Sequence, residues 1–317
     1  MTQGVLGTTD SHLTITSNAV FIPELWSDDV IAAYKTNLIL ASYVTKINHV
    51  GKKGDTLHIP VPTRGVANAK LKETQVIVQA FVETEVTILI DQHFEYSRII
   101  EDILGVQAID SYRAFYTDDA GFALATNVDD ALFTLLEGLQ GGVVGGAGSS
   151  LWEKAVIGGD GTTAYTGNSD NASTLTDAGL RKMIQTLDDA DVPQSERYIV
   201  IPPIERNTLM GIARFTEQAF TGEASQANTI RNGMIGDLYG IQVYVTTNCP
   251  TLVPTSGSNG RAGLMIHKDA LVFVEQMTVR TQTQYKQEWL GDLFTADTIY
   301  GVGELRDTAG LAFVVPA

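Results

Sequence analysis

Few residues in this sequence have the types and spacing that catalysis or metal binding requires. The five histidines are spread along the chain without an HxxxH or HExxH pair, so they predict no zinc site; they are His12, His49, His58, His93 and His267. The single cysteine, Cys249, precedes Pro250 and has no matched base near it in sequence, which argues against a nucleophile. A lone thiol also excludes intramolecular disulfides and four-cysteine zinc sites, and it is typical of a reducing compartment.

The glycine-rich stretches do not match known phosphate-binding or nucleophile motifs. Gly167-Asn168-Ser169 continues as Asp170-Asn171, so it is not a GxSxG elbow. Gly51-Lys52-Lys53 lacks the leading glycine of a phosphate-binding loop. The run Gly141–Gly148 follows a predicted helix, whereas the glycines of a dinucleotide-binding fold follow a strand. A flexible helix exit is the better interpretation of this run.

One acidic cluster, Asp188, Asp189 and Asp191, is the remaining candidate for a metal site. The spacing fails the calcium-loop pattern, and a solvated helix end explains it better. The sequence therefore predicts no catalytic, metal-binding or cofactor-binding residue, and we expect the chain not to be an enzyme. An unrecognised hydrolase that uses the acidic loops stays open as an alternative.

Length, composition and charge further restrict the class of protein that this chain can be. The chain has 317 residues, 44% hydrophobic and 18% charged, so it can bury a sizeable core, and its length favours two domains. The 21 basic and 37 acidic residues give a net charge of −16. This charge excludes a nucleic-acid reader, which needs a basic face, and suits a surface that must not stick to polyanions. The start lacks a signal segment, and no apolar run approaches the roughly 20 residues that span a bilayer, which predicts a soluble protein made in a cytoplasm.

Helical periodicity marks two segments of the N-terminal half. Asp28–Leu40 is predicted to be a short helix with Ser27 or Asp28 as its cap. Residues 106–139 predict a helix of roughly 50 Å, ended by Gly141-Gly142. The aspartates of this helix are expected largely on its exposed side: Asp110, Asp118, Asp119, Asp129 and Asp130. Its apolar stripe comprises Ile109, Tyr112, Tyr116, Ala120, Leu124, Val128, Ala131, Leu135 and Leu139.

Between the two helices, alternating residues predict a long hairpin. Thr56–Pro62 and Val82–Ile90 alternate with a period of two, and a polar stretch around Arg64–Thr74 joins them. Pro60 and Pro62 cannot donate to a ladder, so the first strand is expected at an edge. Two strands alone are marginally stable in water, so the hairpin needs something to dock onto.

The second half predicts alternating helices and strands, after glycine- and serine-rich loops with one or two short strands over residues 141–174. The expected helices are Thr176–Ala190 and Ile204–Arg214, and the expected strands are Tyr198–Ile201, Gly240–Val245, Ala270–Lys286, Phe294–Arg306 and Leu311–Val315. We expect a core that includes Leu180, Met183, Leu187, Ile199, Ile201, Leu209, Ile241 and Val243.

The N-terminal residues 1–20 are too polar to form a core and predict an extended arm. Its apolar anchors are expected to be Leu13, Ile15, Val20 and Phe21. The arm is expected to lie on adjacent copies of the chain; folding back on its own subunit is the alternative. An arm, a long hairpin and a glycine-rich loop in one chain are typical of an assembly subunit.

Two stretches resemble a known family. Arg231–Tyr244, followed by Thr246–Pro250, is similar to the helix, G-x-x-x-G-I-x-V strand and polar turn of tailed-bacteriophage major capsid proteins. Tyr300–Arg306 resembles the last long strand of that family. The order of elements is similar over nearly the whole chain.

This resemblance implies an α+β chain with the Johnson (Hong Kong 97-like) fold. It implies four parts: an N-arm over 1–48, an E-loop over 49–95, a P-domain with a long spine helix over 96–172 and 267–317, and an A-domain over 173–266. It also implies hexamers and pentamers that form an icosahedral shell around double-stranded DNA, without sequence-specific contacts and without a membrane.

The same resemblance implies partners: a portal protein, a scaffolding protein and possible decoration proteins in a virion made in a host bacterial cytoplasm. The family often carries an N-terminal scaffolding segment; its absence here predicts a separate scaffolding protein. Some members join subunits through a Lys–Asn isopeptide. Lys70 and Lys72 lie in the corresponding loop, but no partner motif maps, and ordinary solvated lysines are the alternative. An encapsulin, a cellular shell that holds an enzyme cargo, is the alternative within this fold.

Overall fold

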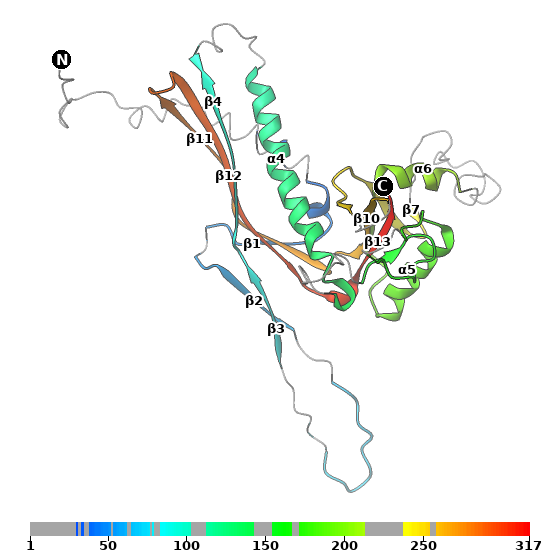
Figure 1. Cartoon of the computed structure of the whole chain (residues 1–317). Helices are drawn as coiled ribbons and strands as arrows, with labels where there is room; N and C mark the ends of the chain where they lie inside the picture. Colours follow the sequence, from blue (N-terminus) through cyan, green and yellow to red (C-terminus); the bar gives the residue numbers. More distant parts are fainter. Residues whose placement is uncertain are drawn as a thin grey trace, which may run out of the picture. The chain divides into compact units, whose positions relative to one another are not determined.

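The computed structural model divides the chain into two compact units. Unit 1 comprises Met1–Asn37, His93–Ala125 and Met277–Ile299, and unit 2 comprises Leu38–Gln92, Thr126–Gln276 and Tyr300–Ala317. The structure describes residues 30, 33–34, 38–51, 53–61, 65–76, 78, 83–102, 112–142, 154–166, 171–212, 237–253 and 258–317 (Figure 1). The N-arm anchors, Trp152 and Arg231–Gly236 lie outside these residues.

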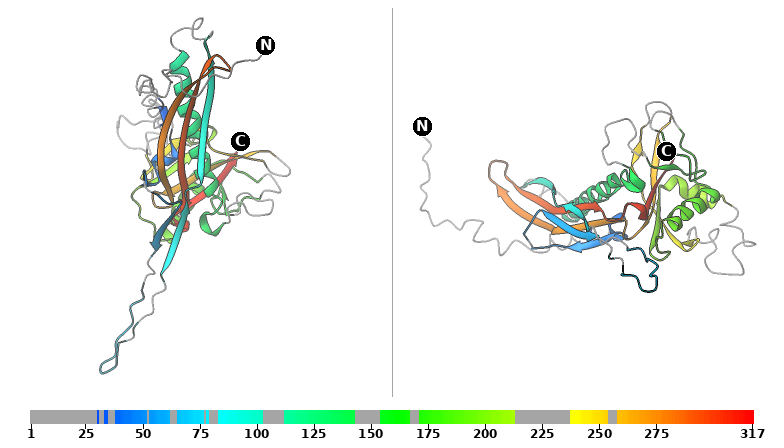
Figure 2. Two further views of the ribbon diagram at one scale, coloured as in Figure 1. Left: turned by 90° about the vertical axis from the view of Figure 1, so that its left-hand side faces the viewer. Right: turned by 90° about the horizontal axis from the view of Figure 1, so that it is seen from below.

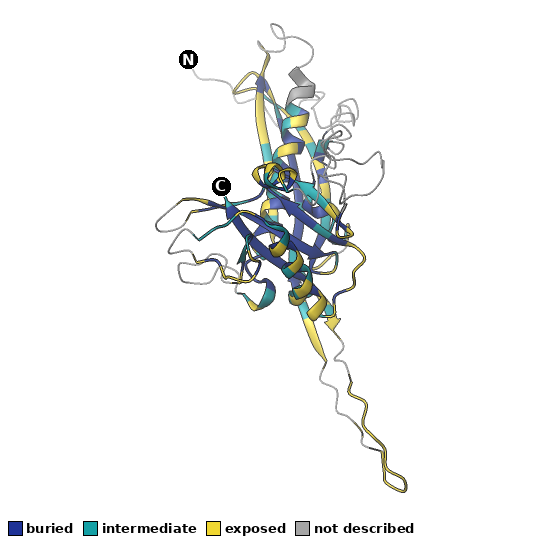
Figure 3. Cartoon of the chain, turned by 90° about the vertical axis from the view of Figure 1, so that its right-hand side faces the viewer, coloured by how far each residue is buried: buried dark blue, intermediate teal, exposed yellow. Residues whose placement is uncertain are grey.

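The core of unit 2 is a seven-stranded sheet of order β5-β13-β10-β6-β8-β7, with β9 paired to β10. The strands are β5 (Val156–Ile157), β6 (Arg197–Ile201), β7 (Asp237–Leu238), β8 (Ile241–Val245), β9 (Thr251–Leu252), β10 (Gly260–His267) and β13 (Gly310–Pro316). β10 and β13 are antiparallel and almost wholly buried, which Figure 3 shows as dark blue strands. Their continuous apolar runs are what a sheet buried on both faces requires.

Two predicted helices pack against this sheet region. α5 (Asp177–Asp189) begins where the Thr176 hydroxyl accepts a hydrogen bond from the Gly179 amide, 3.1 Å away. α6 (Pro203–Met210) begins with proline at its first turn and is followed by Gly211. The prediction that this second helix continues to Arg214 is wrong, because Gly211 and Ile212 are already outside it. The predicted core is confirmed except at Val243, which is half-buried.

A second sheet has the order β1-β11-β12-β4. Its strands are β1 (Thr45–Asn48), β4 (Gln92–Glu101), β11 (Leu271–Lys286) and β12 (Gly291–Glu304). The long C-terminal strands are confirmed, and β11 alternates as expected of a strand with one covered face, since Val279 is buried between exposed Thr278 and Arg280. η4 (Asp307–Ala309) then leads into β13.

The long predicted helix is α4 (Tyr112–Leu135). It is shorter than the predicted 106–139: the helix ends at Leu135, a turn follows, and η3 (Leu139–Gly141) is a separate 3₁₀ segment. Residues 103–111 lie outside the described part. Within unit 1, the N-terminal half of α4 lies beside β4 (Figure 2), where the Tyr96 hydroxyl donates to Asp119 at 2.5 Å.

One prediction about α4 is wrong. Ala120, Leu124 and Val128 of the predicted stripe are buried, but Asp129, which was expected largely on the exposed side, has no exposed surface. Its neighbour Asp130 is exposed as predicted. The carboxylate of Asp129 is buried because it accepts hydrogen bonds from a distant part of the chain, which the local periodicity cannot reveal.

The predicted hairpin is confirmed as β2 (Thr56–Val61) and β3 (Thr84–Leu89), which pair only with each other among the described strands. Pro60 lies opposite Glu85 in this two-stranded ribbon. The predicted N-terminal helix is confirmed at Val30, Ala33 and Tyr34, but it does not extend to Leu40. Residues 38–39 are not helical, and η2 (Leu40–Ser42) is a separate 3₁₀ turn.

The sheet of unit 2 combines segments that we expected in different domains. β13 pairs with β10 over Gly260–Ile266 and with β5 in parallel. Both β5 and β13 come from the ranges expected for the P-domain, whereas β6, β8 and β10 come from the range expected for the A-domain. The four domain boundaries stay a prediction.

Candidate assembly surfaces

The end of the β2–β3 hairpin exposes apolar side chains that nothing in the described part of the chain covers. All described residues between 65 and 78 are exposed, among them Val66 (73%), Leu71 (71%) and Val78 (87%). The end has local order of its own, since the Thr74 hydroxyl donates to the Leu71 carbonyl at 2.8 Å. An ordered segment that exposes large apolar residues is typical of a protein-binding surface.

The base of the hairpin is held firmly in unit 2. Ile88 and Ile90 are buried, and the Ile90 amide donates to the Asp55 carbonyl at 2.8 Å. Two glycines of β12 make room for β3: a Cβ on Gly301 would lie 2.4 Å from the Leu89 carbonyl oxygen, and one on Gly303 would lie 3.0 Å from Ile88. These close approaches explain the Gly-x-Gly of the stretch that resembles the family's last long strand.

A second exposed apolar surface lies at the β11–β12 turn of unit 1, and the sequence analysis did not single it out. Trp289 and Leu290 are 63% and 65% exposed, and Ile99 of β4 is 46% exposed. The Leu290 carbonyl accepts from the Asp102 amide at 2.9 Å, which ties the turn to the end of β4. The sequence signal was a Trp-Leu pair inside a polar stretch between two long strands.

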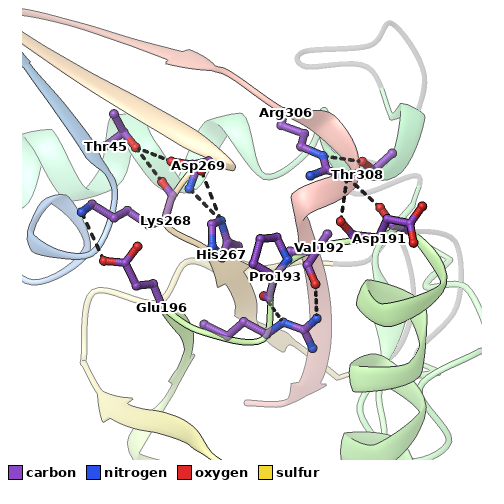
Figure 4. A network of polar contacts seen from close by, with 12 residues as sticks. Thr45, Asp191, Val192, Pro193, Glu196, His267, Lys268, Asp269, Arg306 and Thr308 are labelled. Atoms are coloured by element: carbon purple, nitrogen blue, oxygen red, sulfur yellow. Dashed lines mark hydrogen bonds and ion pairs between the residues drawn. The ribbon is translucent and has the colours of Figure 1, made fainter. Parts of the chain in front are cut away.

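Two arginines, Arg197 and Arg306, stabilise the C-terminal end of α5 in unit 2; Figure 4 labels Arg306 and two of the acceptor residues of Arg197, Val192 and Pro193. Arg197 is 3% exposed and donates to the Val192 carbonyl (2.6 Å), the Pro193 carbonyl (2.8 Å) and the Asp188 carboxylate (2.7 Å). Arg306 donates to the Ala190 carbonyl at 2.6 Å. The acidic cluster considered as a metal site therefore belongs to a helix end, as the sequence interpretation preferred.

Three of the residues considered for chemistry, His93, His267 and Cys249, lie in the described part of the chain with defined surroundings. His93 and Arg280 both contact the buried carboxylate of Asp297 in unit 1, with Arg280 in two-point contact at 2.7 and 3.1 Å. Cys249 is buried, and burial raises the pKa of its thiol to about 12, so it is not a thiolate at neutral pH. Asp269 donates its amide to the buried His267 ring at 3.2 Å.

Neither a metal site nor a membrane span is found in the part of the chain that the structure describes. No group of three or more His, Cys, Asp or Glu side chains in these ranges is arranged to hold a metal ion. None of the helices described is both long and apolar enough to cross a bilayer.

The two mixed sheets, the long helix α4 and the projecting hairpin are those of the Johnson, or Hong Kong 97-like, capsid fold, which defines the class of this protein as a shell-building subunit. The profile of the phage capsid protein family matches residues 99–312, and the chain belongs to this family. It is a major capsid protein, a structural component of the virion. No curated protein sequence matches the chain.

Many solved structures share this fold. The chain is similar to one from Mycobacterium phage Che8, with a TM-score of 0.59 and 21% identity over 82% of this chain and 85% of that chain. It is also similar to the mature capsid of bacteriophage PhiM1 (TM-score 0.64, 12% identity, 99% and 92% covered). A virus-like particle from Pyrococcus furiosus matches with a TM-score of 0.54 and 10% identity over 92% and 98% of the two chains.

Proposed function

We propose that copies of this chain assemble as hexamers and pentamers into an icosahedral shell that encloses double-stranded phage DNA. The observation that carries this proposal is the β2–β3 hairpin, whose base is buried in unit 2 and whose end exposes Val66, Leu71 and Val78. A surface of this kind is covered only when another copy lies against it.

The negative charge supports the DNA-filled shell. The chain carries a net charge of −16, so a wall built from many copies repels a polyanion rather than trapping it during filling. Contacts to packaged DNA are accordingly without sequence specificity. A portal protein, a scaffolding protein and possible decoration proteins complete the assembly, which takes place in the host bacterial cytoplasm before the virion is released.

The experiment is expression of the full chain, followed by negative-stain imaging and sedimentation of the purified protein. Shells are expected for the wild type, and deletion of Gly65–Thr74 is expected to leave folded subunits that assemble poorly. The pair Val66→Ser and Leu71→Ser tests the apolar contact at constant loop length. Lys70→Ser with Lys72→Ser is the matched variant of the same loop, and it also tests whether subunits are covalently joined, by denaturing gel.

Three outcomes contradict the proposal. Wild-type protein that stays monomeric under all assembly conditions refutes the shell itself. Normal shells from the hairpin deletion refute the role of the hairpin. Shells purified from phage-infected cells that contain a protein cargo in place of nucleic acid favour the cellular-shell alternative, which an absorbance ratio and a gel distinguish.

A further inference from the structure

A buried carboxylate of α4 holds a distant segment of the chain by its backbone. Asp129 is 0% exposed; its Oδ1 accepts from the Leu40 amide at 3.1 Å. Its Oδ2 accepts from the Ile39 amide at 3.4 Å and from the Asn248 side-chain amide at 3.2 Å. All three contacts lie within unit 2. The carboxylate thus joins the segment that enters this unit at residue 38 to the turn before β9.

Asp129 is an unusual choice for a buried position. Burial raises the pKa of its carboxyl, and the hydrogen bonds from Asn248 and the backbone amides only partly oppose this shift. An apolar side chain of similar volume would avoid the cost of desolvating a charge, but it would leave the Ile39 and Leu40 amides and the Asn248 side chain without their acceptor. The carboxylate fixes the path of the backbone at residues 39–40, because the amides of both residues must point toward its oxygens to donate their hydrogen bonds.

The residues that follow are fixed just as firmly in unit 2. Leu40, Ala41 and Val44 are buried. The Tyr43 ring stacks on Tyr244 of β8 with a centroid distance of 4.0 Å. The Thr45 amide and hydroxyl both donate to the Lys268 carbonyl, and β1 then pairs with β11 (Figure 4). The chain therefore has no freedom to change direction after residue 38.

A second position of α4 acts on the preceding segment, within unit 1. A Cβ on Gly121 would lie 2.5 Å from the Ala33 Cβ and 2.8 Å from the Tyr34 backbone nitrogen. Glycine in the interior of a helix costs about 1 kcal/mol relative to alanine. The close approach of residues 33–34 gives this glycine a physical reason, because any larger residue would push that segment away.

We propose that α4 carries two separate anchoring points, Gly121 for residues 33–34 in unit 1 and Asp129 for residues 39–40 in unit 2, together called the anchoring track, and that they set the path from which the N-terminal residues reach neighbouring copies. This inference rests on the proposed function, because the track positions a segment for contacts between subunits. Asp129 and Gly121 are positioning residues. Their loss is expected to impair assembly more than folding.

The first test compares Asp129→Asn with Asp130→Asn in the full-length chain. Both changes remove one aspartate from neighbouring positions of α4, but only the first residue is buried and bonded to the backbone. In Asp129→Asn, the side-chain oxygen is neutral and can accept at only one of the two oxygen positions, and the new NH2 group faces donors at the other. Hydrogen exchange at Leu40 is therefore expected to accelerate roughly tenfold, as for the loss of one charge-assisted bond. The yield of shells is expected to fall at least several-fold, whereas Asp130→Asn is expected to match the wild type in both measurements.

The second test is Gly121→Ala, in which a gain in helix propensity opposes a steric clash with residues 33–34. Alanine favours the helix by about 1 kcal/mol, but its Cβ would clash with Ala33 and the Tyr34 backbone, so a purely structural role predicts a lower melting temperature with a normal yield of shells from the protein that folds. The anchoring track predicts displaced residues 33–34 and a several-fold loss of shells from folded subunits. If Asp129→Asn does not accumulate as folded protein, the yield of shells from Gly121→Ala tests the anchoring track by itself.

The outcomes separate this inference from the proposed function. Wild-type chain that forms no shells refutes the proposed function, and rapid exchange at Leu40 in that folded chain refutes the track as well. Shells at wild-type yield from Asp129→Asn or from Gly121→Ala refute the track alone. Equal loss of shells from Asp129→Asn and Asp130→Asn also refutes it, because it would point to charge rather than to the backbone contacts.

Discussion

The buried guanidinium of Arg197 should be the most costly charged group of unit 2 to remove. Its side chain is 2% exposed and makes three hydrogen bonds of 2.6 to 2.8 Å at the end of α5. Arg197→Met keeps the aliphatic part of the side chain but leaves the carbonyls of Val192 and Pro193 without their donor. Asp188, which is 40% exposed, can turn to water, so its loss of a partner adds little.

The expected cost follows from these contacts. A buried acceptor left without a donor costs about 1–3 kcal/mol, and two carbonyls are affected, of which the Val192 bond is the more buried. We therefore expect Arg197→Met to lower the free energy of unfolding by about 3–5 kcal/mol, the range seen when buried charged networks are broken. At about 2–4 °C per kcal/mol for a domain of this size, the melting temperature should fall by roughly 10 °C.

The assay is thermal and urea unfolding of dispersed subunits, followed by circular dichroism. Arg181→Met is the matched control, because Arg181 belongs to the same helix and pairs with Asp177 at 3.2 Å, but it is 56% exposed. That exposed pair is worth about 0.3–0.5 kcal/mol. Equal melting temperatures for the two variants would refute the view that Arg197 secures this helix end.

Three further changes test other parts of the fold. Ile201→Asp buries an unpaired charge at a fully buried position of β6 and should prevent folding, whereas Ile204→Asp, at a 43% exposed position, should be tolerated, as measured by soluble yield. Gly179→Ala places a Cβ 2.1 Å from a backbone carbonyl and should lower the melting temperature by several degrees. The hydrogen bonds from Arg280 and His93 outweigh the effect of burial and lower the folded-state pKa of Asp297 below 3.8. The stability that this carboxylate contributes is therefore present at neutral pH and lost as the pH falls below about 4. In Asp297→Asn, the free energy of unfolding should depend less on pH in this acid range, as measured by unfolding titrations.

The elements of this fold were predictable where neighbouring residues determine them. The alternation of Thr56–Pro62 and Val82–Ile90 predicted the hairpin to within a residue or two of β2 and β3. The helix predicted over Thr176–Ala190 likewise agrees with α5 to within one residue at each end. Each of these signals acts within a few residues of the element that it defines, so the sequence alone carries it.

The parts that could not be predicted depend on distant contacts. Asp129 was expected on the exposed side of α4, but its partners are 89 to 119 residues away in sequence. The same contact explains why the N-terminal helix stops before Leu38, since the amides of Ile39 and Leu40 donate to Asp129 instead of continuing a helix. The joining of β5 and β13 to the sheet of β6 and β8 is another distant pairing, which periodicity does not encode.

Of the two candidate assembly surfaces, one was predicted from the sequence and the other was not. The hairpin end was predicted as a contact surface because a two-stranded ribbon needs support from outside. The Trp289–Leu290 turn was not singled out, because two apolar residues between strands do not reveal their exposure until the turn is built. No catalytic residue was predicted; the structure shows hydrogen-bond partners for His93 and His267 and a buried Cys249.

The two segments proposed to reach other copies share one design. Each is attached at its base by close contacts that a larger or different side chain would disrupt. These contacts involve Gly301 and Gly303 at the hairpin, and Gly121 and Asp129 at the N-terminal segment. The described residues beyond the attachment of the hairpin, 65–76 and 78, are all exposed and so add nothing to the buried core of their own subunit. Substitutions at the attachments should therefore misdirect a contact surface while the sheets stay folded, whereas substitutions in β6 or β10 should abolish both. This separation of folding from assembly is what a subunit needs if it is to fold before its neighbours are present.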